Sequence, residues 1–347
     1  MRKEAGGEAR PPFLVKSRVE AMVDVTMSDA TAADRARVLR GYISRDRLFH
    51  NLTRGSALLV LIILFGVMVS LFLGAMPALR AFGFNFFITQ SWNPVTEKFG
   101  ALAPIYGTLV TSVIAMAIAV PVGIGIAIFL TELCPRVLSR PIGIAIELLA
   151  GIPSIIYGIW GLFVFAPFLQ QTLQPALIEL FGPIPVLNAL FAGPPYGIGM
   201  LTASLILAIM VLPFITSITR DVFETTPAVL KESAYALGAT TWEVVWKVVL
   251  PFTRAGVFGG VMLGLGRALG ETMAVTFVIG NAHKINPSLL APGTTISATI
   301  ANEFTEAVGD LYTSALIALG LILFFITFAV LAIARYLLSR IEQHPGL

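Results

Sequence analysis

The sequence predicts an all-α polytopic membrane protein with six transmembrane helices and with its N and C termini in the cytoplasm. Three observations lead to this prediction. Of the 347 residues, 56% are hydrophobic and only 12% are charged, whereas a soluble domain has about 25% charged residues. Six long apolar runs follow one another along the chain. The basic residues are concentrated in alternate segments between these runs.

Each apolar run is long enough to cross about 30 Å of hydrocarbon as a helix. Because the number of runs is even, both termini lie on the same side. Of the 23 Lys and Arg residues, 19 lie in segments on that side, three lie on the other side, and Arg267 lies inside a run. Since basic residues favour the cytoplasm, we expect the termini and the 220–254 segment to be cytoplasmic. The runs cover 57–76, 104–131, 142–168, 198–219, 255–280 and 312–334.

The chain divides into a transmembrane domain, 57–338, with a tail on each side. Residues 1–56 are predicted to be a cytoplasmic tail, and residues 339–347 a short C-terminal tail. The pattern over 32–53 fits an amphipathic helix at the membrane surface or, equally, a solvated tail. The single Cys134 excludes an internal disulfide, and three widely spaced histidines argue against a metal site.

Arg267 and Glu271 are the most unusual residues of the fifth run. A charge in the middle of a membrane span is costly, and such residues usually face an interior or a watery path. At a spacing of four they share a helix face and can pair. We interpret Arg267 as an anion-binding group, because a guanidinium matches phosphate-like oxygens. Glu271 would compete with the anion, and Thr272 continues the polar trace. The alternative is a salt bridge that serves only insertion or packing.

Two further features of the membrane runs have open interpretations. Glu147 lies in the third run, shortly before Pro153, which is expected to kink the helix; the pair fits either a substrate pathway or a packing kink. In the fifth run, glycine recurs every four residues at Gly256, Gly260 and Gly264. This face lets another helix approach closely, either within the chain or from another subunit.

The 220–254 segment is a polar island with helical patterning. Residues 228–237 are predicted to form a short helix that Gly238 ends, and residues 242–249 a second one that Pro251 stops. A hairpin of this kind between two membrane spans indicates docking to a cytoplasmic partner. The chain contains no phosphate-binding G-x-x-x-x-G-K-[ST] loop, so we expect no ATPase site, no catalytic residues and no cofactor of its own.

The island also carries a motif. Glu232-Ser-Ala234-Tyr-Ala-Leu-Gly238, followed by Val-Val-Leu-Pro251, resembles the "EAA" signature of ABC-importer permeases. The resemblance implies a type I importer permease fold. It also implies that Glu232, Ala234, Gly238 and Pro251 belong to a coupling element that seats on a separate ATP-binding subunit.

Two more stretches, Arg267-Ala-Leu-Gly-Glu271 and Glu147-Leu-Leu-Ala-Gly-Ile-Pro153, resemble the phosphate-specific transport permeases of that family over about residues 57–338. The resemblance implies import of inorganic phosphate. The implied partners are a PstA-like sister permease, two copies of a PstB-like ATPase that binds the ATP, and a periplasmic phosphate-binding protein. Two other functions stay open: a permease for another oxyanion, such as molybdate or sulfate, and an ion-coupled secondary transporter.

Overall fold

The computed structural model describes residues 32–342, and the parts of the two predicted tails beyond these residues lie outside the description. The chain divides into two compact units, 1–70 and 71–347. The described part of the first unit belongs to one helix, α2 (Ala32–Phe82), which continues into the second unit. The helix predicted over 32–53 and the first membrane span are therefore one uninterrupted helix.

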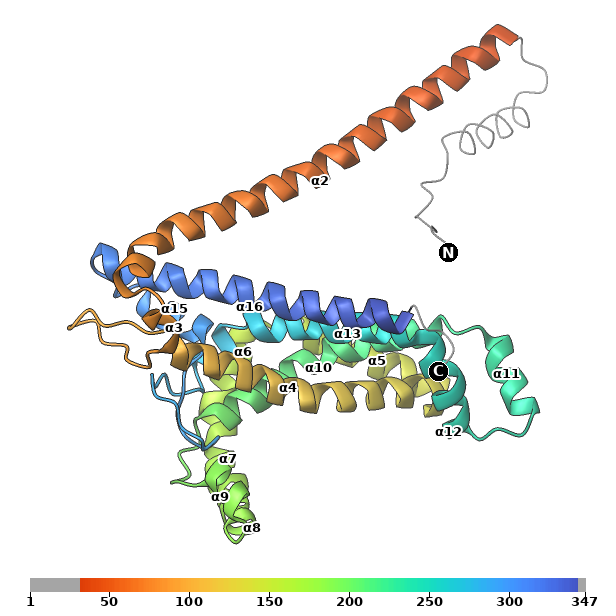
Figure 1. The fold of residues 1–347 in the computed structure, drawn as a ribbon. Helices are drawn as coiled ribbons and strands as arrows, with labels where there is room; N and C mark the ends of the chain where they lie inside the picture. The colour runs from red at the N-terminus through yellow and green to blue at the C-terminus, as the bar shows by residue number, and fades with distance from the viewer. Residues whose placement is uncertain (1–31, 343–347) are drawn as a thin grey trace, which may run out of the picture. The chain divides into compact units, whose positions relative to one another are not determined.

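The second unit is helical, and within the described residues an isolated bridge between Asn93 and Lys98 is its only strand-like pairing. Figure 1 shows its long helices running side by side. Six helical stretches in the described chain are long and apolar enough to cross a membrane, so the predicted number of spans is confirmed. The elements after α2 are α3 (Asn85–Ile88), α4 (Leu102–Ile128), η1 (Phe129–Leu133), α5 (Arg136–Ala150), α6 (Ser154–Trp160), η2 (Gly161–Phe165), α7 (Ala166–Gln171), α8 (Leu173–Phe181), α9 (Pro185–Phe191), α10 (Met200–Glu224), α11 (Ala228–Ala236), α12 (Thr241–Val244), η3 (Val245–Val249), α13 (Leu250–Gly270), α14 (Met273–Thr276), α15 (Ile296–Glu303) and α16 (Asp310–Glu342).

Helix α10 is the centre of this unit. It packs against α4 on one side and α13 on another, and α5 and α14 also contact it. Its apolar side chains, such as Ile206, Leu207 and Val211, are fully buried in the main core cluster. A helix that is buried on most of its faces fixes the positions of the helices around it, so α10 is the reference for the site described below.

The predicted third span, 142–168, is wrong as a single helix. The chain forms α5, breaks at Gly151–Pro153, and continues as α6, and the stretch that is long enough to span begins at Ser154. Pro153 has no N–H to donate and disfavours a helical conformation in the residue before it. The sequence indicated a kink here, but the helix ends and a new one begins.

The prediction that Pro251 stops a helix is also wrong. The chain is helical without interruption from Thr241 to Gly270, and Pro251 lies near the start of α13. The five preceding residues, Val245–Val249, form a π-helical turn. A proline lacks the N–H that an α-helix uses. The wider turn changes the hydrogen-bond pattern just before the proline, so the helix continues through it.

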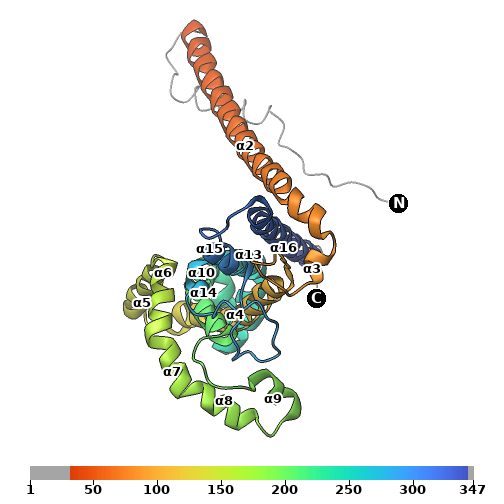
Figure 2. The same ribbon diagram turned by 90° about the vertical axis from the view of Figure 1, so that its left-hand side faces the viewer.

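The second unit has two different ends. Figure 1 shows α11, α12 and the C-terminal end of α16 at one end. The opposite end carries α3, α15 and the loop between α14 and α15, and Figure 2 looks onto this end. The C-terminal part of α9 reaches this loop, because the N–H of Leu289 donates to the carbonyl of Leu190. We call the first the hairpin end and the second the loop end.

Candidate functional site

The fifth span, which the sequence predicted to be continuous over 255–280, is broken in the structure. Helix α13 ends at Gly270, and Glu271 has an extended backbone with φ −70° and ψ 131°. The short helix α14 starts two residues later. One Glu271 carboxylate oxygen accepts a hydrogen bond from the backbone N–H of Ala274 at 3.2 Å. The Glu271 side chain therefore satisfies a backbone donor that the start of a new helix exposes.

The break in the third span lies beside this one, because α6 packs directly on α14. A Cβ atom added to Gly158 of α6 would lie 3.1 Å from the carbonyl oxygen of Met273 and 3.2 Å from Cα of Ala274. Its neighbour Tyr157 is buried, and its hydroxyl donates to the carbonyl of Leu149 before the break, at 2.9 Å. The helices that follow the two breaks, α6 and α14, therefore pack directly on each other.

Arg267 lies in the last turn of α13, on the side that faces α10. Its guanidinium carbon is 4.3 Å from the centroid of the Phe214 ring. Phe214 is near the middle of α10, so the charge sits about halfway along the bundle. A guanidinium over a ring face is attracted by about 0.5–2 kcal/mol. The position also suits a cation, because the C-terminus of a helix carries partial negative charge.

Arg267 and Glu271 do not pair. The ion pairs among residues 32–342 include none with Arg267. Its Nε is buried without a hydrogen-bond partner in this range. The expected spacing of four along one helix is lost because α13 ends between the two residues. The structure therefore removes the alternative of mutual neutralisation and leaves a half-buried cation that no described carboxylate balances.

Thr272 lies directly after the end of α13 and before α14, and its role in the substrate pathway stays a prediction. Its hydroxyl is 3.4 Å from the carbonyl of Gly270, and its own carbonyl accepts from the Thr276 hydroxyl at 2.7 Å. Asn281 donates in turn to the carbonyl of Thr276 at 3.4 Å. These groups lead from the helix break toward the loop end.

Glu147 has a different setting from the one expected in the membrane interior. Its carboxylate is 2.6 Å from Nη2 of Arg220, and its side chain is 45% exposed. Nη2 of Arg220 is also 2.9 Å from the Asp221 carboxylate. The Arg220 side chain packs against Gly143, because a Cβ atom added to this glycine would lie 2.3 Å from Nη1 of Arg220. Glu147 thus joins α5 to α10 near the hairpin end, beside a pocket of about 470 Å³. Its role in the substrate pathway stays a prediction.

The glycine face of α13 packs within the chain. An added Cβ at Gly256 would lie 2.5 Å from Val222, and one at Gly264 would lie 2.8 Å from Ile215, both on α10. Gly260, between them, faces Ile218 of the same helix. Of the two interpretations of this glycine face, packing within the chain is the one that the structure shows. Through this face α13 packs closely on α10, the membrane helix on the other side of the hairpin.

The hairpin forms as the sequence predicted up to Gly238. Helix α11 ends at Ala236, and Gly238 has φ +86°, a conformation that favours glycine. Glu232 is exposed, whereas Ala234 is half-buried and packs on the core cluster at this end. The hairpin also exposes large apolar side chains, namely Val229 (69%), Leu237 (90%) and Trp242 (66%).

Lys231 makes a contact that sequence reasoning missed. Its Nζ is 2.5 Å from Oε1 of Glu132, whose side chain is only 6% exposed. Glu132 belongs to η1, the π-helical turn that ends the second span. The two residues are 99 positions apart, and no local pattern relates them. The only hint in the sequence that Lys231 has a role is its position directly before the motif residue Glu232.

A second unpredicted cluster lies at the loop end. The His283 ring stacks on Trp92 at a centroid distance of 5.3 Å, and its Nε2 is 3.6 Å from Oε1 of Glu303. The hydroxyl of Tyr312 donates to the same carboxylate. Burial lowers the pKa of His283, and the carboxylate of Glu303 offsets part of this effect.

Within residues 32–342, six candidate spans, a surface hairpin and an arginine without an ion-pair partner beside a helix break characterise a multi-pass membrane protein. Residues 119–343 match the family model described as the binding-protein-dependent transport system inner membrane component, and the chain belongs to this family. It is therefore a multi-pass protein of the inner membrane and a component of a transport system.

The curated relatives agree. The chain is 70% identical over 317 residues to the phosphate transport system permease protein PstC of Mesorhizobium japonicum, covering 91% of this chain and 97% of that protein. It is 60% identical over 299 residues to the PstC protein of Pasteurella multocida, covering 86% and 93%. A solved bacterial ABC transporter involved in the import of the acidic polysaccharide alginate shares the fold, with a TM-score of 0.58, 18% identity and coverage of 87% and 99%.

Proposed function

We propose that this chain is the permease subunit of an ATP-driven ABC importer for inorganic phosphate and forms half of the translocation pathway. The observation that carries the proposal is the unbalanced guanidinium of Arg267 at the helix break, halfway along the bundle. The names of relatives at 54–70% identity, all phosphate transport permeases, support phosphate as the substrate.

The chemistry of the site fits a travelling oxyanion. A guanidinium presents several N–H donors in a fixed plane and matches the oxygens of a phosphate ion. The Phe214 ring holds the guanidinium without neutralising it. None of the ion pairs within residues 32–342 joins Glu271 to Arg267, so Glu271 does not hold the guanidinium in this conformation. Weak, single-cation binding in the middle of the path permits release, which a transporter requires.

The chain supplies no chemical step in this proposal. ATP is bound and hydrolysed by a separate PstB-like subunit in two copies, and a PstA-like sister permease completes the pathway. A periplasmic phosphate-binding protein delivers the ion at the loop end. The hairpin end then faces the cytoplasm, in agreement with the distribution of basic residues.

The structure offers a route by which the hairpin can act on Arg267. The hairpin joins α10 to α13, and the glycine face packs these two helices closely together. Phe214 of α10 and Arg267 of α13 are in contact farther along the same pair. Movement of the hairpin by the ATPase would therefore shift both partners of this contact. Transport then depends on different binding of phosphate in two conformations.

The test is phosphate uptake by the reconstituted complex. Replacing Arg267 by Ala should abolish ATP-dependent uptake of labelled phosphate, while the chain still inserts and co-purifies with its ATPase. Normal uptake in Arg267→Ala would remove this residue from the pathway. Uptake without any ATPase would instead support an ion-coupled carrier, and stronger competition by molybdate or sulfate than by unlabelled phosphate would assign another oxyanion.

A further inference from the structure

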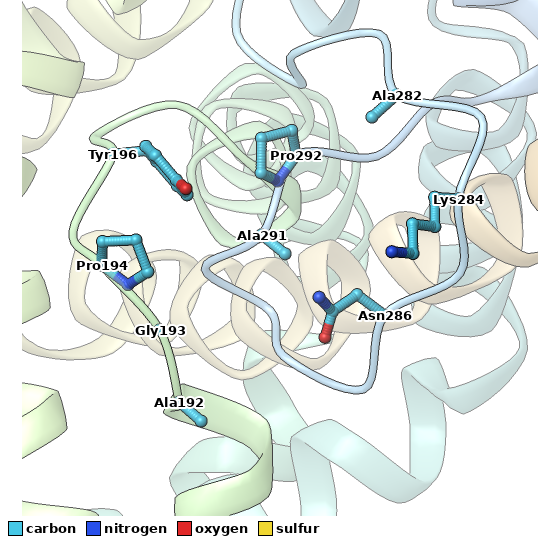
Figure 3. Close-up of a pocket in the computed structure, with 9 residues that line it drawn as sticks. All are labelled: Ala192, Gly193, Pro194, Tyr196, Ala282, Lys284, Asn286, Ala291 and Pro292. Carbon is cyan, nitrogen blue, oxygen red and sulfur yellow. The ribbon is translucent and has the colours of Figure 1, made fainter.

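A pocket of about 240 Å³ opens at the loop end, away from the helix breaks. Its walls come from two segments that are distant in the sequence, residues 192–196 and residues 282–292. Figure 3 shows Lys284 and Asn286 on one side of the opening and Tyr196 on the other. The other lining residues are small or apolar, and none of them is a carboxylate.

The polar groups of this pocket are hydrogen-bond donors. None of the ion pairs within residues 32–342 involves Lys284. Oδ1 of Asn286 already accepts from the backbone N–H of Ser288 at 2.9 Å, which leaves its NH₂ group for the opening. The Tyr196 hydroxyl adds a third group that can donate. A pocket with one unpaired cation, an amide donor and no carboxylate is suited to an anion.

The loop that carries these donors is held in place at both edges. The N–H of Ala282 donates to the carbonyl of Gly293 at 2.9 Å, and the N–H of Leu289 donates to the carbonyl of Leu190 at 2.8 Å. Next to Lys284, His283 is stacked on Trp92. Donors that are already positioned lose less conformational freedom when a ligand binds. The pocket is therefore preformed, by one backbone contact that closes the loop and one that joins the loop to the end of α9.

We propose that this pocket is an outer binding site for a free tetrahedral oxyanion, with Lys284 and Asn286 as its principal donors. The proposal rests on the proposed function, which places the loop end on the side where phosphate arrives. The loop continues directly from α14 and the helix break. An ion released at this end would first be held by Lys284 and would then pass to Arg267 in the interior.

The experiment measures site protection in the purified complex, without ATP and without the binding protein. Cys134, the chain's one cysteine, is changed to Ser, and Ala192 in the pocket wall is changed to Cys as a reporter. The rate of modification of this cysteine by an anionic thiol reagent is measured with added inorganic phosphate, sulfate or chloride at matched ionic strength. Matching is needed because salt alone screens exposed charges.

We expect phosphate and sulfate to slow modification severalfold and chloride to leave it nearly unchanged. Lys284→Gln should remove the protection and Lys284→Arg should keep it. Lys98→Gln, which removes an exposed lysine from another loop at the same end, serves as the matched control and should also keep it. Because no transport is measured, this result is independent of whether the complex imports phosphate.

Three results would overturn the proposal. One is equal slowing by chloride, which would mean screening alone. Another is protection that persists in Lys284→Gln, which would place the anion elsewhere. The third uses a soluble short-chain phosphatidylglycerol as an additional additive: protection by this lipid and not by inorganic phosphate would assign the donors to a lipid headgroup instead of a free ion.

Discussion

Nζ of Lys231 lies 2.5 Å from Oε1 of Glu132, and this contact links the surface helix α11 to the end of the second membrane span. The covalent connections of the hairpin lead only to α10 and α13. The ion pair adds a third attachment, to the π-helical turn that follows α4. Motion of the hairpin can therefore reach three membrane spans at once.

Charge reversal tests this attachment. Lys231→Glu and Glu132→Lys should each reduce ATP-dependent uptake strongly, because each leaves like charges in a largely buried contact. Removing one partner of a buried ion pair costs about 3–5 kcal/mol. The double variant should recover a large part of the uptake, since it restores opposite charges at the same two positions. ATPase activity measured alongside uptake shows whether coupling or assembly is affected.

Lys247→Gln is a suitable control, because the ion pair of Lys247 with Glu243 is exposed on the hairpin and both residues lie on one helix. This variant should have little effect. If the Lys231–Glu132 double variant is no better than the worse single variant, the ion pair does not couple the two elements.

The glycine face of α13 makes a prediction about stability. Gly256→Val places a side chain where an added Cβ already lies 2.5 Å from Val222. Overpacking of this kind costs about 1–3 kcal/mol, so the chain should unfold at a lower temperature in detergent. Gly259, one helix position from the face of Gly260, has nothing within 4 Å of its added Cβ. Gly259→Ala should therefore be neutral or raise the melting temperature, because alanine favours the helix by about 0.5–1 kcal/mol. Equal losses in both variants would contradict the packing described here.

The number of spans and the hairpin motif were predictable because both depend on local signals. Apolar length defines a span, and Gly238 ends a helix through its own backbone conformation. The breaks were harder to predict, since each depends on tertiary partners. The chain leaves the helix after Gly270 and Glu271 caps a new start, but nothing in the apolar pattern over 255–280 distinguishes this from a continuous helix.

The candidate site was predictable in residue type and less so in geometry. Arg267 stands out in sequence as a charge within an apolar run. Its partner, Phe214, is one of 24 phenylalanines in the chain, and no spacing rule connects α10 to α13. Pairing of Arg267 with Glu271 was predicted from helical spacing and is wrong, because a single break changes which side chains share a face. The pairing of Glu147 with Arg220 depends on a long-range contact of the same kind.

The ring of Phe214 should matter for transport through its charge distribution, since it faces the guanidinium of Arg267. Phe214→Leu keeps an apolar side chain but loses a cation–π contact worth about 0.5–2 kcal/mol. We expect a severalfold lower rate of phosphate uptake with normal assembly. Phe214→Tyr retains an aromatic face and should transport nearly normally. Equal impairment in both variants would mean that packing volume, and not the interaction with Arg267, determines the effect.

His283 gives the protein a pH dependence with a defined sign. Burial lowers its pKa below the usual value of 6.5, so the folded protein binds the proton less tightly than the unfolded chain does. Stability should therefore fall as the pH is lowered from about 7 through the range below 6.5. Glu303 opposes this effect through its charge but does not reverse it.

The check is the melting temperature of the detergent-purified chain between pH 7.5 and pH 5.5. His283→Gln should show a smaller decrease over this range than the unsubstituted chain, whatever its absolute stability. His50 is exposed on α2, so His50→Gln should keep the original decrease and serves as the control. Stability that rises on acidification, and does so only while His283 is present, would mean that attraction to Glu303 outweighs the burial of the charged ring.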